Sequence, residues 1–227
     1  MLWSILIGID YYTRHECLQG AVHDVRACED HLKATFEDFE RDITILTATT
    51  PSDVASLTPR EHPDKWPTWN NIDKALLRIT AEAKKGDSVF IHYSGHGTSE
   101  PSANNQRQTS SALALALTDG MISTQGKMCN GGETPGYELL YGQTLAYRLK
   151  ELGDMGLPVT LVLDCCFSGN VIRTESGVRW IEYNPSARVV GQDADGPKLS
   201  SSSQDGALRH QWLLNPENYT ILAACGP

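Results

Sequence analysis

Two short segments of this chain carry side chains that could do covalent chemistry. The segment Ser94–Gly97 contains His96, and the segment Asp164–Gly169 contains two adjacent thiols, Cys165 and Cys166. An imidazole that takes the proton of a nearby thiol creates a strong nucleophile. Glycines beside such groups let a substrate backbone approach closely and leave N–H groups free to bind a developing oxyanion. The chain therefore has the parts of a Cys–His nucleophile pair, provided that the fold brings the two segments together.

Each segment directly follows an apolar run of strand length. Ser88–Tyr93 runs into the histidine segment, and Pro158–Asp164 runs into the cysteine segment. In open α/β sheets, function gathers at the carboxyl ends of the strands. If both runs are parallel strands of one sheet, the imidazole and the thiols reach the same edge of it.

In the rest of the chain, apolar runs of strand length alternate with segments in which apolar residues recur at helical spacing. This pattern predicts an α/β fold, an α/β/α sandwich around a mostly parallel central sheet with helices on both faces. Further predicted strands are Leu2–Ile9, Ile43–Ala48 and Tyr219–Ala224, and predicted helices are Ala21–Phe36, Asn70–Lys85 and Tyr141–Leu152.

The length of 227 residues suits one sizeable domain, so we interpret residues 1–227 as a single domain. Two polar stretches, Thr98–Ser111 and Gln192–Gly206, are predicted to be loops. The sequence ends soon after its last predicted strand, which is compatible with a domain truncated at its C-terminus.

Composition and charge exclude several classes of partner. The net charge is -9, whereas a nucleic-acid-binding domain needs a basic face. No stretch approaches the ~20 apolar residues of a membrane span, and the first residues lack the basic region of a signal peptide. None of the six cysteines forms a CxxC pair, which argues against a zinc ribbon. We expect a cytoplasmic protein with reduced thiols and with no nucleic-acid or membrane partner.

The two adjacent thiols can be distinguished by strand parity. Side chains alternate between the faces of a strand, so Asp164 and Cys166 share one face and Cys165 lies on the other. The face with the acid is the polar one, which makes Cys165 a buried core thiol. Parity therefore favours Cys166 as the nucleophile, although Cys165 stays an alternative on this argument alone.

The two segments in this order resemble the histidine and cysteine motifs of metacaspases, within the caspase-like peptidases. The motifs read Tyr-Ser-Gly-His-Gly at residues 93–97 and Asp-Cys-Cys-Phe-Ser-Gly at residues 164–169, and the likeness covers nearly the whole chain. The resemblance implies a caspase-like fold and a cysteine endopeptidase, a thiol protease of a family linked to regulated cell death. It also implies that His96 is the catalytic base and Cys166 the nucleophile.

The same resemblance implies how a substrate would bind. The backbone N–H groups of Gly97 and Cys166 would form the oxyanion hole. The family cleaves after Arg or Lys through an acidic pocket, and Asp164 and Asp24 match the positions of the pocket acids. Two carboxylates facing a guanidinium make a sound bidentate arrangement. The implied partners are proteins or peptides with Arg or Lys at the cleaved position. Expected internal targets are Arg188, Lys198 and Arg209.

Calcium is a cofactor of many members of the family, which bind it through clustered aspartates. The corresponding places here hold the segment Tyr137–Gly142 and Arg173, which offer few hard oxygen ligands. Asp119 remains, but one aspartate does not make a site. The residue after the nucleophile is Phe167, where many metacaspases have histidine. We therefore expect no cofactor.

Two other classes of protein compete with an active peptidase. A caspase-like module without activity, used for signalling or interaction, is favoured by the missing calcium ligands. A flavodoxin-like ligand-binding domain is disfavoured because the chain lacks a G-x-G-x-x-G loop for phosphate. The intact His96 and Cys166 favour the peptidase.

The scarcity of acidic ligands leads to a prediction about calcium. We expect millimolar calcium to leave the peptidase activity of the protein unchanged, because Arg173 and the segment Tyr137–Gly142 cannot replace a cluster of carboxylates. Initial rates on a peptidyl-Arg substrate, measured with calcium and with a chelator, test this. A large, saturable rise with calcium would contradict it.

Overall fold

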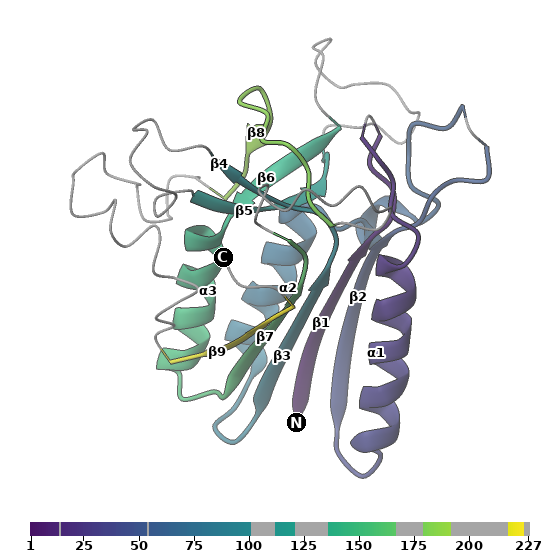
Figure 1. The fold of residues 1–227 in the computed structure, drawn as a ribbon. Helices are drawn as coiled ribbons and strands as arrows, with labels where there is room; N and C mark the ends of the chain where they lie inside the picture. The colour runs from purple at the N-terminus through teal and green to yellow at the C-terminus, as the bar shows by residue number, and fades with distance from the viewer. Residues whose placement is uncertain are drawn as a thin grey trace, which may run out of the picture.

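A computed structural model describes residues 1–13, 15–53, 55–100, 112–120, 136–166, 179–191 and 218–224. Within them the chain forms the predicted α/β architecture, with a parallel central sheet and helices on both of its faces (Figure 1). A short 3-10 helix, η1 (Pro63–Lys65), precedes the second α-helix.

The central sheet has the strand order β2-β1-β3-β7-β9 in the described part of the chain, and every neighbouring pair is parallel. All eight residues of the inner strand β1 are buried, which explains why its sequence is apolar without alternation. The strands are β1 (Leu2–Ile9), β2 (Arg41–Ala48), β3 (Ser88–Ser94), β7 (Val159–Asp164) and β9 (Thr220–Ala223).

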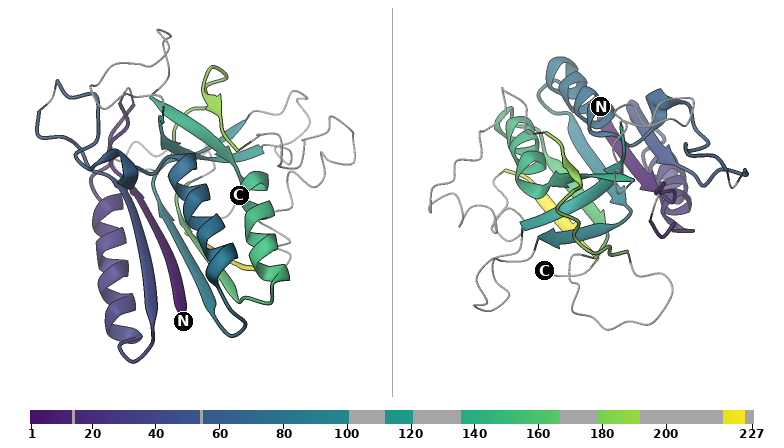
Figure 2. Two further views of the ribbon diagram at one scale, coloured as in Figure 1. Left: turned by 180° about the vertical axis from the view of Figure 1, so that it is seen from behind. Right: turned by 90° about the horizontal axis from the view of Figure 1, so that it is seen from above.

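Helices cover the two faces of this sheet unequally. Helix α1 (Ala21–Thr35) packs on one face, where Val25 and Leu32 form a small cluster with strand residues. Helices α2 (Trp69–Glu82) and α3 (Gly142–Asp154) cover the other face and complete the larger core cluster. The view from above in Figure 2 shows α1 on the side of the sheet opposite to α2 and α3.

A second sheet, which the sequence analysis did not predict, lies over the carboxyl ends of the parallel strands (Figure 1). Its strand order in the described residues is β4-β5-β6-β8, with antiparallel pairs except between β6 and β8. The strands are β4 (Gly97–Glu100), β5 (Ala112–Thr118), β6 (Tyr137–Tyr141) and β8 (Arg188–Val189).

The loop predicted for Thr98–Ser111 is therefore wrong at its start, because Thr98–Glu100 belongs to β4. These short polar residues form a strand because β5 offers them backbone partners, which no local pattern reveals. Residues 101–111 and the whole of Gln192–Gly206 lie outside the described residues. No helix among the residues that the structure describes is long and apolar enough to cross a membrane.

Gly8 sets how closely α1 approaches the central sheet. A Cβ at this position would lie 2.8 Å from the backbone oxygen of Ala21 and 2.8 Å from a methyl carbon of Val25. We expect Gly8→Ala to lower the free energy of unfolding by about 1–3 kcal/mol, since the helix and strand must move apart. Urea unfolding measures this. Gly120→Ala is the control, because its Cβ would meet nothing nearer than 3.6 Å, and an equal loss there would contradict the packing argument.

Candidate active site

Strands β3 and β7 are direct neighbours, and their last residues are in register. Ser94 pairs with Asp164, and each strand then continues for two residues to a reactive side chain. The continuation of β3 carries His96 and that of β7 carries Cys166. The predicted meeting of the two segments at one edge of the sheet is confirmed.

The backbone of His96 is fixed by two tyrosine hydroxyls. Its N–H donates to the Tyr12 hydroxyl at 2.8 Å, and its carbonyl oxygen accepts from the Tyr93 hydroxyl at 2.7 Å. A Cβ at Gly95 would lie 2.7 Å from the Tyr93 hydroxyl and 2.9 Å from that of Tyr12. This glycine is therefore required by the packing of the two tyrosines.

The imidazole ring of His96 is oriented by a contact with the backbone of Glu16. Its Nε2 lies 2.9 Å from the carbonyl oxygen of Glu16, so Nε2 carries the proton and donates. Nδ1 is buried and has no hydrogen-bond partner among the described residues. Burial lowers the pKa of His96 below its ordinary value of 6.5, against the opposing effect of the Glu16 carbonyl. The ring is thus held neutral, with an acceptor nitrogen available for a proton.

Burial along β7 follows the parity argument for the two cysteines. Buried and half-buried residues alternate through the strand, and the alternation continues beyond it to buried Cys165 and half-buried Cys166. Cys165 is 1% exposed and belongs to the main core cluster. No disulfide involves either thiol. Cys166 is therefore the thiol presented on the polar face with Asp164.

The two N–H groups predicted to bind an oxyanion converge on one acceptor. The N–H of Gly97 donates to the carbonyl oxygen of Arg179 at 2.9 Å, and the N–H of Cys166 donates to the same oxygen at 3.1 Å. The two donors thus lie close enough to share a single oxygen, which is the geometry that a developing oxyanion requires.

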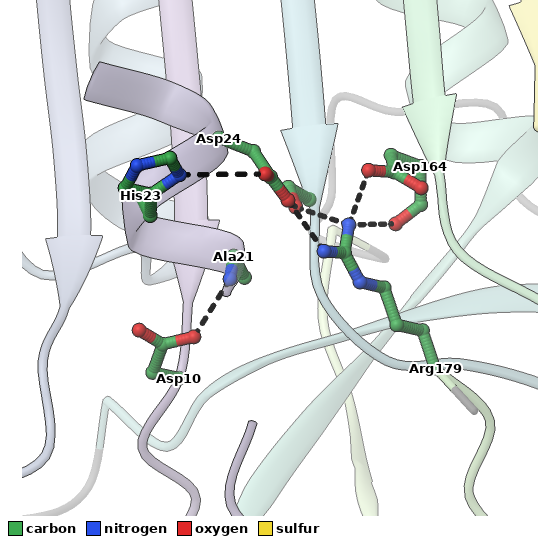
Figure 3. A network of polar contacts seen from close by, with 7 residues as sticks. Asp10, Ala21, His23, Asp24, Asp164 and Arg179 are labelled. Carbon is green, nitrogen blue, oxygen red and sulfur yellow. Dashed lines mark hydrogen bonds and ion pairs between the residues drawn. The ribbon is translucent and has the colours of Figure 1, made fainter. Parts of the chain in front are cut away.

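Asp24 and Asp164, the two predicted pocket acids, also lie together (Figure 3). The guanidinium of Arg179 lies between them and forms an ion pair with each carboxylate. Ser94 completes the cluster, since its hydroxyl accepts from Arg179 at 2.6 Å and contacts Asp24 at 3.2 Å. Burial lowers the pKa of the Arg179 guanidinium, but the two carboxylates outweigh it and the net pKa is raised.

The start of helix α1 positions Asp24. At the end of β1, a carboxylate oxygen of Asp10 accepts the N–H of Ala21 at 2.8 Å and so caps the first turn of the helix (Figure 3). Burial raises the pKa of Asp10, whereas this backbone hydrogen bond and the nearby Arg179 oppose the rise. Asp24 then lies in the first turn, where the helix dipole favours a negative charge.

Sequence reasoning missed four residues that build this site. Tyr12 and Glu16 contact His96, but neither belongs to a recognisable sequence motif. Arg179 also lies in a part of the sequence that has no recognisable motif. Ser94 could have been found, because strand alternation places it on the same face as His92, beside the pocket acids. Burial lowers the pKa of His92, which is itself buried in β3.

No metal-binding cluster is present in the described part of the chain, which contains no group of three His, Cys, Asp or Glu side chains that could hold an ion. In the segment Tyr137–Gly142, Glu138 is buried and its pKa is raised to about 7, mainly by burial. Its carboxylate pairs with Arg188 at 2.8 Å. Arg173 lies outside the described residues, so the expectation about calcium stays a prediction.

A parallel α/β sheet that brings a thiol and an imidazole to the same carboxyl edge has the architecture of a caspase-like peptidase. The family model described as the metacaspase, peptidase C14 domain matches residues 3–128, more than half of the chain. The chain therefore belongs to the metacaspase family, and the enzyme class predicted from the sequence, a cysteine endopeptidase, is the class of that family.

Similar curated proteins are also metacaspases. Metacaspase-7 of Arabidopsis thaliana is 41% identical over 43% of this chain and 22% of its own length. Metacaspase-6 of the same plant is 29% identical over 74% of this chain and 38% of its own length. Metacaspase-1 of Coccidioides immitis is 33% identical over 43% of this chain and 19% of its own length. The chain thus spans well under half of these relatives.

Among solved structures, a crystal structure of a protein from Geobacter sulfurreducens is similar, with a TM-score of 0.47 and 17% identity. The match covers 75% of this chain and 52% of that chain. The fold class rests on the strand order and helix placement of the chain itself.

The different burial of the two cysteines leads to a prediction. We expect Cys166→Ala to abolish hydrolysis of peptide substrates, because it removes the half-buried thiol that is predicted to be the nucleophile. Cys165→Ala should keep most of the activity, since it changes a core thiol by one atom. Initial rates of the two purified variants, each checked for folding by circular dichroism, make the comparison. Equal losses in both variants would contradict the assignment.

Proposed function

We propose that the protein is a cysteine endopeptidase that hydrolyses peptide bonds after Arg or Lys, with Cys166 as nucleophile and His96 as base. Membership of the metacaspase family supports the peptidase class. Proteins and peptides with a basic residue at the cleaved position are the proposed substrates.

In the proposed reaction, Nδ1 of His96 accepts the proton of the Cys166 thiol. The Glu16 carbonyl keeps the opposite nitrogen protonated, and burial lowers the pKa of His96, which favours the neutral ring. The thiolate attacks the scissile carbonyl carbon and forms a tetrahedral intermediate. The N–H groups of Gly97 and Cys166 bind its oxyanion.

The later steps use the same groups. The imidazolium of His96 gives its proton to the leaving amine, and the acyl group stays on Cys166 as a thioester. A water molecule, deprotonated by the same imidazole, then hydrolyses the thioester and releases the new carboxylate. The rigid backbone around His96 suits this double role, because both transfers require the ring in one place.

The observation that carries the proposed specificity is the position of the Arg179 guanidinium between Asp24 and Asp164, while the carbonyl oxygen of the same residue accepts the two N–H donors. An arginine side chain fits this cluster by forming ion pairs with both acids. An aspartate in a substrate would meet two like charges there and be rejected. Lysine would satisfy the charge, but as a compact ammonium it cannot reproduce the planar fork.

A panel of fluorogenic peptides that differ only at the cleaved position tests this specificity. We expect kcat/KM to be highest for Arg, lower for Lys and negligible for Asp. Asp164→Asn should lower kcat/KM for the Arg peptide by about 10- to 100-fold, or roughly 1.4–2.7 kcal/mol. The loss is at the low end for a charge pair, because the Asp164 side chain is 38% exposed and solvent screens it.

Asp73→Asn is the matched control, since it also removes a carboxylate that pairs with an arginine, but on α2. Efficient cleavage after Asp, or an unchanged Arg preference in Asp164→Asn, would contradict the pocket. A folded protein that cleaves none of the peptides would instead favour an inactive interaction module. The observation that favours the inactive interaction module is that the chain's own Arg179 occupies the site.

A further inference from the structure

His92 lies on the same face of the central sheet as the two pocket acids. It is two residues before Ser94 in β3, so the two side chains share a face, and Ser94 is in register with Asp164 of β7. Helix α1, which carries Asp24, packs on this face. His92 is therefore one step deeper in the sheet than the cluster that holds the guanidinium of Arg179.

The ring of His92 is buried without a complete set of hydrogen bonds. The residue is 7% exposed, and its Nδ1 has no hydrogen-bond partner among the described residues. A protonated imidazole donates from both nitrogens, so a buried Nδ1–H without an acceptor costs free energy. Phe90, the next residue on the same face of β3, packs against the apolar cluster under α1. These surroundings favour the neutral ring.

The charged groups that face His92 come from three parts of the chain. Burial lowers the pKa of His92 below its ordinary value of 6.5. Asp164 at the end of β7 and Asp24 on α1 oppose this effect, because each favours a positive charge on the ring. Arg179 adds to it, because its own positive charge repels a second one. The protonation of His92 therefore depends on whether a cation lies between the acids.

The other residues around the ring add no buried charge. Leu6 of β1 is in register with His92, and Cys28 of α1 belongs to the apolar cluster, where burial raises the pKa of its thiol. His23 lies 4.0 Å from Asp24, but its side chain is 84% exposed and solvent screens its charge (Figure 3). A charge on His92, by contrast, would be buried behind the acids.

Arg179 is the cation that the acids hold in the described part of the chain. Of the basic residues expected to be internal targets, Arg188 pairs with Glu138 instead, and Lys198 and Arg209 lie outside the described residues. With the Arg179 guanidinium in place, the two carboxylates keep one uncompensated negative charge, and without it they keep two. An emptied cluster therefore attracts a proton to the ring behind it.

We propose that His92 is a specificity-determining residue of the pocket, because a proton on its ring and a guanidinium between Asp24 and Asp164 compete for the same carboxylates. The neutral ring leaves both acids to an arginine side chain, whereas the charged ring offsets part of their charge and repels the cation. By linkage, a bound guanidinium disfavours the proton on His92 to the same extent. For a substrate arginine this inference rests on the proposed function, whereas for Arg179 it rests on the described cluster alone.

The first test measures the binding of N-acetylargininamide to the full chain with Arg179→Gln, which removes the internal guanidinium. Calorimetry should give a Kd that is about 5- to 20-fold larger at about pH 5 than at about pH 8. Most of this difference should be absent in Arg179→Gln/His92→Gln, since glutamine is polar but takes no proton. N-acetylcitrullinamide, the uncharged analogue of the probe, should show no dependence on His92.

Two exposed histidines of α1 provide matched controls in the same background. His31→Gln should keep the full difference in Kd between the two pH values, because His31 is exposed and far along the helix from Asp24. His23→Gln should keep most of it, because solvent screens the charge of His23. A difference that disappears with His23→Gln and persists with His92→Gln would overturn the assignment to His92.

The second test follows the ring of His92 by NMR. Its pKa should be higher in Arg179→Gln than in wild type, and N-acetylargininamide should lower it again. Asp24→Asn in the otherwise wild-type chain should lower the pKa instead, because this variant removes an anion that faces the ring. These opposite signs distinguish an effect of charge from a general change in packing, and Asp24→Asn decides the question without an emptied pocket.

The outcomes separate this proposal from the proposed function. An equal pH dependence of Kd with and without His92, or a pKa of His92 that none of the charge changes moves, would overturn the proposal. If the protein also cleaves peptides after Arg, the peptidase would stand without it. On a peptidyl-Arg substrate, we expect His92→Gln to change the pH dependence of KM and to leave that of kcat as it is. A folded protein that shows the linkage with the probe but cleaves no peptide would overturn the proposed function and keep this inference.

Discussion

The parallel pairing of β3 with β7 is the constraint on which the rest of the site depends. Because Ser94 and Asp164 are in register, the residues two positions further along each strand emerge side by side at the sheet edge. A shift of the register by one residue would turn Cys166 into the core and Cys165 outward. The buried strand residues make such a shift costly, since every apolar side chain of β7 would change face. The relative position of His96 and Cys166, the proposed nucleophile pair, is therefore secured by the hydrophobic core.

The second sheet gives the imidazole its fixed position. The backbone of His96 lies between the two sheets, since the N–H of Ala116 in β5 donates to its carbonyl oxygen at 3.0 Å. The Tyr12 and Tyr93 hydroxyls, both buried, bind the same short stretch of backbone. The role proposed for His96, a base that accepts and returns a proton, benefits from such a fixed position, because small displacements lower the rate. The core thus holds the thiol, and the junction of the two sheets holds the base.

The order of the central elements could be predicted from the sequence because it is encoded locally. Long apolar runs predict buried strands, and the alternation in β7 predicts which cysteine is half-buried, since burial follows the pleat through Cys166. The second sheet could not be predicted, because its short strands depend on pairing with one another and not on the residue types within each strand. Arg179 could not be predicted either, since it is 155 residues from Asp24 along the chain. A contact between residues so far apart produces no periodic pattern in the sequence from which it could be predicted.

The pocket acids explain why a cation belongs in the site at all. Asp24 and Asp164 lie close together, with the buried Asp10 nearby, and burial, with a smaller contribution from Asp24, raises the pKa of Asp10. The guanidinium of Arg179 lies between Asp24 and Asp164 and opposes that rise. A basic substrate side chain would make the same contacts, so the two compete for one place. The internal residue has the advantage of effective concentration, whereas the external one must also give up its translational freedom. With the specificity proposed above, a basic substrate would have to displace Arg179 from the two acids. The charge arrangement that would select basic substrates is therefore the same one that holds the chain's own Arg179 in their place.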